Sequence, residues 1–371
     1  MPRMCNERVN CANGGVHAAA AISHTFCNRT TARCSVDKLV LPATYRPQLD
    51  LHETQIAIKR IKDFFQLRLA ERLNLLRVSA PLFVDPASGM NDDLSGVERP
   101  VSFEIPALDG AEGEVVQSLA KWKRYALGRY GFGYGEGLYT DMNAIRRDEQ
   151  TDNLHSIFVD QWDWEKVILP EDRTIDTLLN HVERIYDVMR RCEGYMEQCY
   201  SHVEPILPER PYVISTQELL DRYPGLSPKE RELEIVRAKG AVILTKIGDA
   251  LSNGEPHDGR APDYDDWSLN CDIIVHYPLL DCAFELSSMG VRVDASALAA
   301  QLEKAGCPER AGLAFQKAVL EDALPQTIGG GIGQSRLCMF FLRKAHIGEV
   351  QSSLWPDDML ERCAQAGITL L

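Results

Sequence analysis

Residues 325–342, PQTIGGGIGQSRLCMFFL, carry the strongest local signal for chemistry. Four glycines follow a short extended run, and Ser335 and Arg336 open an expected helix. Glycines allow the backbone to approach a phosphate closely, and a helix start presents unpaired N–H groups to it. Gln334 replaces the last glycine of a dinucleotide fingerprint, and no GKS or GKT of a P-loop follows. A structural glycine-rich turn is an equal alternative, but Arg336 in the first helical turn favours an anion site.

A second string, DCAFELSSMGVRV at 281–293, places charged groups in a strand-like segment. Glu285 and Ser287 share one parity, while Ser288 and Arg292 share the other. Together with Asp272 upstream, Glu285 is a candidate ligand of a magnesium ion that bridges phosphates. A salt bridge between Glu285 and Arg292 is the structural alternative, and the residues alone favour it slightly.

The string VDQWDWE at 159–165 has two distinct faces if it forms a strand. Gln161 and Asp163 lie on one face, and Trp162 and Trp164 lie on the other. This arrangement offers paired polar groups above a packed base. A half-exposed structural strand explains the same pattern, although two tryptophans on one short strand indicate a rigid platform.

A fourth string, AIRRDE at 144–149, brings Arg146 and Glu149 close in sequence to the glycine-rich GFGYGEG at 131–137. Taken alone, it is only a charged loop.

The hydrophobic spacing predicts the elements that must position these groups. Apolar residues three or four apart from Ile58 to Leu73 predict a helix, which begins after Pro47 and which Asn74 ends. The next run, LLRVSAPLF, predicts a strand whose Pro81 lies at an edge or an interface. Alternation over residues 101–105 predicts a half-buried strand in an antiparallel pair.

The remaining chain mixes both kinds of element without regular alternation. Strands are expected near 155–164, 241–247, 272–277 and 282–293, and helices within 172–200 and near 229–239, 297–305, 309–321 and 334–344. Strands that do not alternate with helices argue against a doubly wound parallel sheet. The predicted fold class is α+β, with an antiparallel β-sheet that carries the site and helices that flank it. Residues 47–371 are expected to form a single catalytic domain.

Composition narrows the possible partners. The 371 residues are 45% hydrophobic and carry a formal net charge of −14. This charge repels polyphosphate backbones, so nucleic acid is not an expected partner. No stretch approaches the roughly 18 apolar residues of a membrane span, so no membrane partner is expected.

Cysteine usage indicates a reduced, cytoplasmic protein, because seven of the eleven cysteines are scattered through apolar or helical patterns without paired spacing. The other four, Cys5, Cys11, Cys27 and Cys34, lie in a different segment and lack the close pairs of a zinc knuckle. Residues 1–46 are expected to be a disordered extension. A transit peptide is the alternative, since basic residues outnumber acidic ones there, but an apolar helical face is lacking.

Taken in order, these strings resemble the ammonia-dependent aspartate–ammonia ligases, the A-type asparagine synthetases, whose fold is that of class II aminoacyl-tRNA synthetases. The resemblance covers about residues 50–355. The matching strings are NDDLSG (91–96), SLAKWKR (118–124), GEGLYTDMNAIRRDE (135–149), VDQWDWE (159–165), RAPDYDDWS (260–268), FELSSMGVRVDA (284–295) and PQTIGGGIGQSR (325–336). It implies amidation of L-aspartate by ammonia through a β-aspartyl adenylate, with ATP as substrate, Mg²⁺ as cofactor and a homodimer built on the opening helix and strand.

The resemblance also implies residue roles. For the nucleotide these are Arg146 at the α-phosphate, Glu149 at adenine, and Gly331, Gly333 and Arg336; for magnesium they are Asp272 and Glu285; for the substrate pocket and its rim they are Ser118, Lys123, Gln161, Asp163, Asp265, Ser288 and Arg292. Asp92 matches the aspartate that contacts the substrate side chain, and it is the expected orienter or base for ammonia. Arg147 competes with Arg146 for the α-phosphate. The connection at 268–271 is shorter than in bacterial members, which puts any lid there in doubt.

Three other classes of protein are alternatives to this resemblance. An aspartate- or asparagine-type aminoacyl-tRNA synthetase needs an anticodon-binding domain, for which 46 residues before the core are too few, and a basic surface. A catalytically inactive paralogue is expected to lose adenylate-binding residues, and the matched positions are retained. Glutamine-using B-type synthetases carry a cysteine after the initiator methionine, where this chain has Pro2.

Overall fold

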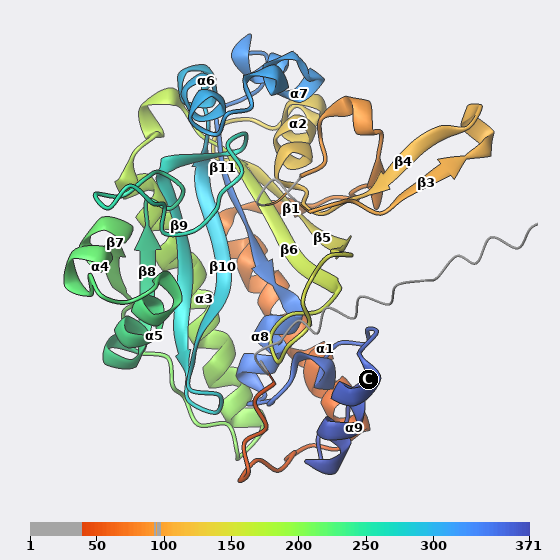
Figure 1. Cartoon of the computed structure of the whole chain (residues 1–371), viewed down its shortest axis with the longest axis vertical. Coiled ribbons are helices and arrows are strands. Elements are labelled where there is room, and N and C mark those ends of the chain that lie inside the picture. The colour runs from red at the N-terminus through yellow and green to blue at the C-terminus, as the bar shows by residue number, and fades with distance from the viewer. Residues whose placement is uncertain (1–38, 93, 95–97) are drawn as a thin grey trace, which may run out of the picture. The chain divides into compact units, whose positions relative to one another are not determined.

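The structure is a computed structural model that describes residues 39–92, 94 and 98–371 (Figure 1). Its helices are α1 Leu51–Leu73, α2 Ala120–Tyr130, α3 Ile175–Cys199, α4 Thr216–Arg222, α5 Pro228–Lys239, α6 Ala295–Lys304, α7 Ala314–Leu320, α8 Gln334–Phe341 and α9 Asp357–Gln365. Its strands are β1 Leu75–Arg77, β2 Phe83–Val84, β3 Ser102–Ile105, β4 Ala111–Val115, β5 Gly137–Ile145, β6 Phe158–Val167, β7 Tyr212–Ser215, β8 Ala241–Thr245, β9 Asp265–Tyr277, β10 Cys282–Arg292 and β11 Thr327–Gly333.

The main sheet has the strand order β1-β5-β6-β11-β10-β9-β8-β7. Its six central strands pair antiparallel, and the end strands β1 and β7 pair parallel with β5 and β8. A small second sheet, β2-β4-β3, extends away from it (Figure 1). The α+β prediction with an antiparallel sheet flanked by helices is therefore confirmed, with a parallel pair added at each edge.

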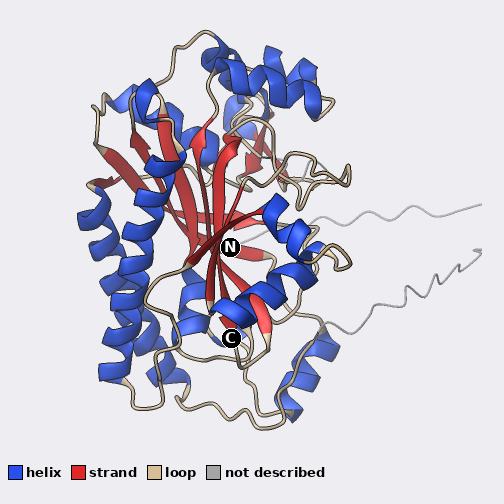
Figure 2. Ribbon diagram, turned by 90° about the vertical axis from the view of Figure 1, so that its left-hand side faces the viewer, coloured by secondary structure: helices blue, strands red, loops and turns tan. Residues whose placement is uncertain are grey.

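The hydrophobic core fills one face of the main sheet, where α1, α3 and α8 pack (Figure 2). Trp162 stacks on Phe65 of α1 with ring centroids 4.9 Å apart, and Trp164 stacks on His181 of α3 at 6.1 Å. Because side chains alternate along β6, the polar residues between these tryptophans point to the opposite face. The expected division of VDQWDWE into an apolar and a polar face is confirmed.

The start and end of the first helix follow from its sequence. Asp50 and Glu53 form a capping box at the N-terminus of α1, and Asn74 ends the helix in the left-handed conformation with φ 59°.

The helix expected at 309–321 is wrong in its first part. Residues Pro308–Gly312 form a 3-10 turn, and α7 starts only at Ala314.

The single strand expected for LLRVSAPLF is also wrong. It is divided into β1 in the main sheet and β2 in the small sheet, and Pro81 lies in the connection between them. Proline has no N–H for a ladder and therefore favours this break. The strand expected at 101–105 does pair antiparallel with β4, but it is not half-buried, since Phe103 is 39% exposed.

The glycine-rich and polar stretches form strands. The glycines at 329–333 form the interior of β11, which pairs with both β6 and β10, so the alternative of a structural turn is wrong. The expected junction between an extended run and a helix that Ser335 and Arg336 open is confirmed. The connection at 268–271 lies inside β9, which begins at Asp265, well before the expected start at 272. A bulge where β9 pairs with β10 near Gly290 accommodates the extra residues. The short connection is thus a strand irregularity.

Residues 39–46, which the sequence assigned to the extension, contact the core. The Asn153 side chain accepts from Val40 N at 2.7 Å and donates to Val40 O at 2.8 Å. The hydroxyl of Tyr45 donates to Glu349 Oε2 at 2.8 Å in a buried site. The rest of the expected extension, residues 1–38, lies outside the described residues.

No described helix has the length and the apolar composition of a membrane span. The cysteines in the described part of the chain are all free: Cys192, Cys199, Cys271, Cys282, Cys307, Cys338 and Cys363.

Replacing Tyr45 with Phe removes the hydroxyl that Glu349 accepts from and keeps the ring. We expect the free energy of unfolding to fall by about 1–3 kcal/mol, because a buried carboxylate loses one of its donors. Denaturant titration measures the change. Tyr134→Phe is the control, since Tyr134 is 62% exposed. Equal losses in the two variants would show that residues 39–46 do not stabilise the core.

Candidate active site

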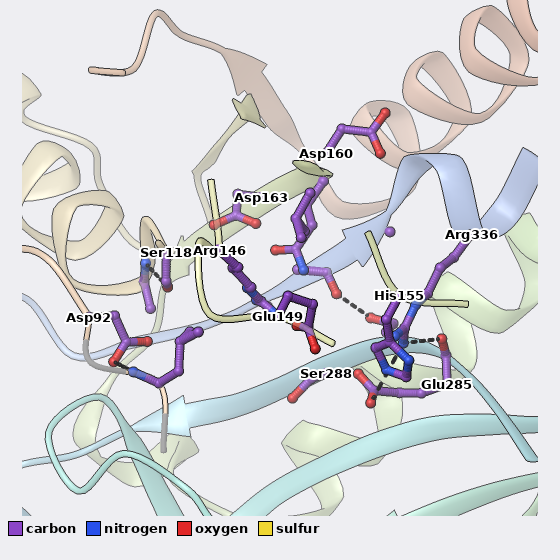
Figure 3. Close-up of a pocket in the computed structure, with 18 of the residues that line it drawn as sticks. Asp92, Ser118, Arg146, Glu149, His155, Asp160, Asp163, Glu285, Ser288 and Arg336 are labelled. Atoms are coloured by element: carbon purple, nitrogen blue, oxygen red, sulfur yellow. Dashed lines mark hydrogen bonds and ion pairs between the residues drawn. The ribbon is translucent and has the colours of Figure 1, made fainter. Parts of the chain in front are cut away.

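A cavity of about 400 Å³ lies on the polar face of the main sheet. Its floor is formed by β6, β11 and β10. Its walls come from Asp92, Leu94 and Glu98, from the segments at 146–156 and 259–264, and from the start of α8 (Figure 3). The sheet thus brings the four strings of the sequence analysis to one place. All the predicted site residues line this cavity except Asp272: they are Asp92, Ser118, Lys123, Arg146, Glu149, Gln161, Asp163, Asp265, Glu285, Ser288, Arg292, Gly331, Gly333 and Arg336.

One end of the cavity is cationic. Arg336, in the first turn of α8, donates to Glu285 O at 3.0 Å and lies 3.8 Å from Glu285 Oε2. Burial would raise the pKa of Glu285, but Arg336 first, followed by Arg260, Lys229 and Arg146, lowers it below its usual value. Arg260 is paired with Asp272, and Lys229 with Glu232 and Asp258. Arg336 and Arg146 are therefore the cations of this end that suit a phosphate chain.

Arg146 is the better placed of the two arginines of AIRRDE. It lines the cavity and is half-buried, whereas Arg147 is exposed and is not part of the lining. Its Nε is buried without a hydrogen-bond partner among the described residues. Glu149, three residues on, shares a turn with it through the bond from Glu149 N to Arg146 O at 3.1 Å.

Asp272 lies behind this end on β9, directly opposite Ser288 of β10. Its carboxylate is bound by Arg260, while Oδ1 is buried without a hydrogen-bond partner in the described chain. Burial raises the pKa of Asp272 to about 7, with the nearby Glu285 acting in the same direction and Arg260 opposing. A vacant carboxylate oxygen beside a second carboxylate fits a hard divalent cation. Within the described chain, no three acidic, His or Cys side chains gather into a complete metal site.

The other end of the cavity is built on Arg292. Its guanidinium contacts Glu165 through two bonds, Nε to Oε1 at 2.9 Å and Nη2 to Oε2 at 2.7 Å, and its Nη1 binds Asp265. The salt bridge between Glu285 and Arg292 that the sequence slightly favoured is therefore wrong. The bulge between Glu285 and Ser287 and four further residues of β10 separate the two charges.

Burial sets the electrostatics of this network. Arg292 and Asp265 are each 2% exposed, and Glu165 is fully buried. Burial raises the pKa of Asp265 above its usual value, although Arg292 opposes it. At Glu165, Arg292 outweighs burial and the pKa is lowered. The charges of Arg292, Glu165 and Asp265 thus stabilise one another. Removing one of them would leave its partner buried and unpaired.

Lys123 joins the same network from α2. It donates to Gly330 O at 2.8 Å and lies 3.1 Å from Asp163 Oδ2. Asp163 Oδ1 is buried and has no hydrogen-bond partner among the described residues. Buried polar atoms are rarely left without a partner, so Asp163 Oδ1 is a candidate acceptor for a ligand.

The glycines of β11 leave room for the polar side chains of β6, Gln161, Asp163 and Glu165, to lie flat across the sheet. A Cβ atom on Gly331 would come within 2.5 Å of Gln161 Oε1 and 3.0 Å of Asp163 Oδ1, and one on Gly329 would overlap Glu165. Only glycine leaves room for the side chains of β6 to extend across the next strand.

Asp92 and Ser118 lie on the side of the cavity away from Arg336 and Glu285 (Figure 3). Asp92 is buried, and its Oδ1 accepts from Leu94 N at 3.1 Å. The hydroxyl of Ser118 accepts from Ala120 N at 3.1 Å and helps to start α2. The neighbouring carboxylate, Asp93, lies outside the described residues.

Several lining residues were missed. Arg260 and Tyr264 belong to the string RAPDYDDWS, where charged and aromatic residues were visible but no role was assigned. Tyr264 lies against Arg292, whose guanidinium carbon is 5.7 Å from the ring centroid. His155 and Gln351 also line the cavity. The sequence gives no periodic or spacing signal for Gln351, which only the fold brings close.

Comparison with solved structures identifies the class of fold. An asparaginyl-tRNA synthetase from Entamoeba histolytica in complex with asparaginyl-adenylate matches with a TM-score of 0.57 at 11% identity, over 81% of this chain and 66% of that chain. The synthetase from Pyrococcus horikoshii, also complexed with asparaginyl-adenylate, matches with a TM-score of 0.56 at 15% identity, over 82% and 70%. The chain spans about two thirds of the length of these synthetases. At these identities the likeness establishes a class II aminoacyl-tRNA synthetase fold.

Comparison of sequences identifies the family within this class. The family model described as aspartate-ammonia ligase matches residues 52–367. Aspartate–ammonia ligases from Ruminiclostridium cellulolyticum and Clostridium tetani are 58% and 56% identical, each over 91% of this chain and over 100% and 99% of their own length. The chain belongs to the aspartate–ammonia ligase family, and its reaction is the synthesis of asparagine from aspartate and ammonia.

Replacing Gly331 with Ala tests whether the polar side chains of β6 require a neighbouring strand without side chains at this position. We expect a loss of about 1–3 kcal/mol of stability from overpacking, together with a loss of activity, because the new methyl group must displace Gln161 or Asp163. Gly194→Ala is the control, since nothing lies within 4 Å of a Cβ atom at this helical position. That change should be neutral or slightly stabilising. Thermal melting and product formation measure both variants, and a tolerated alanine at 331 contradicts the packing argument.

Proposed function

We propose that asparagine synthesis runs through a β-aspartyl adenylate formed in this cavity, with release of AMP and diphosphate. The observation that carries the proposal is the division of one cavity into a cationic end around Arg336 and a paired, carboxylate-rich end around Arg292. The first end suits a polyphosphate, and the second suits an amino acid with its ammonium and carboxylate groups. The aspartate side chain meets the α-phosphate where the two ends join.

Arg146 and Arg336 neutralise the α-phosphate as the aspartate oxygen attacks it. The attack brings two anions together, so fixed positive charge that needs no reorganisation lowers the barrier. Arg146 has a buried Nε without a partner in the described chain, which supports a ligand there. Glu149 takes the adenine, and the backbone at Gly331 and Gly333 forms the floor under the nucleotide.

Magnesium completes the phosphate end. Asp272 and Glu285 are the residues that would hold the ion, and it would supply positive charge that offsets their carboxylates beside the phosphates. Arg260 is already bound to Asp272, so this guanidinium either shares the carboxylate with the ion or turns to the phosphates.

The substrate end orients the amino acid. Arg292 offers its guanidinium plane, and Gln161, Asp163, Asp265 and Ser288 surround the space above it. Lys123 forms an ion pair with Asp163 and thereby fixes its carboxylate. Asp92 faces the same space from the opposite wall, where it orients ammonia and accepts a proton from it during attack on the activated carbonyl.

A homodimer and a cytoplasmic location belong to the same proposal. Leu76 of β1 and Phe83 of β2 are 62% and 46% exposed beside the opening helix, as expected for residues that a second subunit covers. The free, mostly buried cysteines suit a reducing compartment.

The direct experiment is to incubate the protein with ATP, Mg²⁺, aspartate and ammonium and to measure AMP and asparagine. A tRNA-charging enzyme forms adenylate and stops without tRNA, and an inactive paralogue forms neither product. Replacing ammonium with glutamine in the same assay shows whether an amide can serve as the nitrogen donor.

Replacing Arg336 with Ala should slow adenylate formation by about 100-fold or more, the usual scale for one group that stabilises developing charge. Aspartate-dependent exchange of pyrophosphate into ATP measures this step without ammonia. Arg147→Ala is the control, because Arg147 is exposed and does not line the cavity. Exchange at the wild-type rate in Arg336→Ala would remove this arginine from the nucleotide site.

Replacing Asp92 with Asn separates the two half-reactions. An amide keeps the acceptor for Leu94 N but cannot take a proton from ammonia, so asparagine production should fall more than pyrophosphate exchange. Asp93→Asn serves as the neighbouring control and should affect both steps mildly. An equal loss of both half-reactions in Asp92→Asn would assign the residue to substrate binding.

A further inference from the structure

Helix α8 begins without a cap of its own. Its N-cap residue is Gly333, which has no side chain to accept from the first free N–H groups. The N–H of Ser335 instead donates at 3.0 Å to Asp160 Oδ1, which belongs to β6. The cap therefore comes from a strand far away in sequence, and its charge has the sign that a helix N-terminus favours.

Asp160 is held by a small buried network. Its Oδ1 also accepts from Gln351 Nε2 at 3.1 Å, and its Oδ2 accepts from Lys62 Nζ of α1 at 3.1 Å. Gln351 Nε2 in addition lies 3.1 Å from Ser335 Oγ. The start of α8 is thus joined to β6, to α1 and to the segment that follows the helix.

We propose that Asp160 is a positioning residue for adenylate formation: it caps α8 from β6 and thereby fixes the origin of the Arg336 side chain. The inference rests on the proposed role of Arg336 at the α-phosphate. Asp160 does not itself point at the reacting groups, since its carboxylate is directed toward α8 and α1 (Figure 3).

The need for such a cap follows from the shape of the side chain that it serves. Arg336 stands one residue after Ser335, and its tip is fixed by a bond to Glu285 O at 3.0 Å. A long side chain fixed at the tip but not at the base can reach the phosphate in many ways. Misplacement by about 1 Å can cost 100-fold in rate. Asp160 removes this freedom at the base.

Three variants separate capping from charge and from general stability. Asp160→Ala removes the acceptor for Ser335 N, and we expect the kcat of pyrophosphate exchange to fall about 10- to 100-fold while the KM for aspartate is unchanged. Asp160→Asn keeps an acceptor oxygen and should restore kcat to within about threefold of the wild type. Lys62→Ala breaks the ion pair and leaves both bonds to Asp160 Oδ1, so it should also stay within about threefold.

A double-variant cycle provides the decisive test. If Asp160 acts through Arg336, then adding Asp160→Ala to Arg336→Ala should cause no further loss of exchange beyond about threefold. Losses that multiply would overturn the inference, because Asp160 would then act by another route. An Asp160→Ala protein with wild-type kcat would also overturn it. Should Asp160→Ala fail to fold, Asp160→Asn decides alone: a loss as large as that of Arg336→Ala contradicts capping by an acceptor oxygen.

Failure of the inference differs from failure of the proposed function. If Arg336→Ala exchanges pyrophosphate at the wild-type rate, the role of Arg336 is wrong and the inference falls with it. If Arg336→Ala is slow but Asp160→Ala is not, only the positioning role is lost.

Discussion

The site depends on one strand that carries almost no side chains. β11 lies between β6 and β10, and its glycines leave a flat strip over which Gln161, Asp163 and Glu165 extend. Glu165 can therefore reach Arg292 on β10, two strands away, at 2.7 Å. With ordinary side chains on β11, these charges would be separated by a ridge. The glycine string that indicated an anion site in the sequence thus also brings charged neighbours together.

This flat strip has an energetic consequence. Buried charges stay in place only when partners and hydrogen bonds compensate the loss of water, and removing one partner typically costs about 3–5 kcal/mol. Arg292, Glu165 and Asp265 compensate one another, and Thr327 Oγ1 adds a bond to Glu165 Oε1 at 2.7 Å. The Arg292 end is therefore a rigid, pre-oriented surface. The Arg336 end is different, because Arg146 has a buried Nε without a hydrogen-bond partner among the described residues.

The sequence could predict the strands that carry the site and the residues that line it. It could not predict which charged side chains pair with one another there. Strings with unusual residue types, such as VDQWDWE, identified β6 and its two faces because alternation in a strand is a local property. The pairing of Arg292 depends on register: bulges in β9 and β10 decide which carboxylate it meets, and no local pattern encodes them. For the same reason the nearby Glu285 was an attractive partner in sequence and not in space.

Glycine left the other ambiguity, because in the sequence a structural turn was an equal alternative to an anion site. A run of glycines has no side-chain periodicity, so it is read as a turn unless the neighbouring strands are known. Here the neighbours decide: the glycines fit only because β6 supplies polar side chains above them. Gln351 and Asp160 show a further limit, since both act on the start of α8 from distant segments.

The part of the cavity lined by His155 and Ile347 is also bound to the segment before the first helix. Asn153 uses its side chain to bind Val40 on one side and Ala345 O at 2.8 Å on the other, and its own carbonyl accepts from Ile347 N at 2.8 Å. Ile347 and His155, two residues after Asn153, both line the cavity. Since Asn153 joins these two walls and is bound by Val40, contacts outside the sheet help to set the width of this part of the cavity. The sheet fixes the floor of the site, and the first residues that the structure describes help to fix its walls.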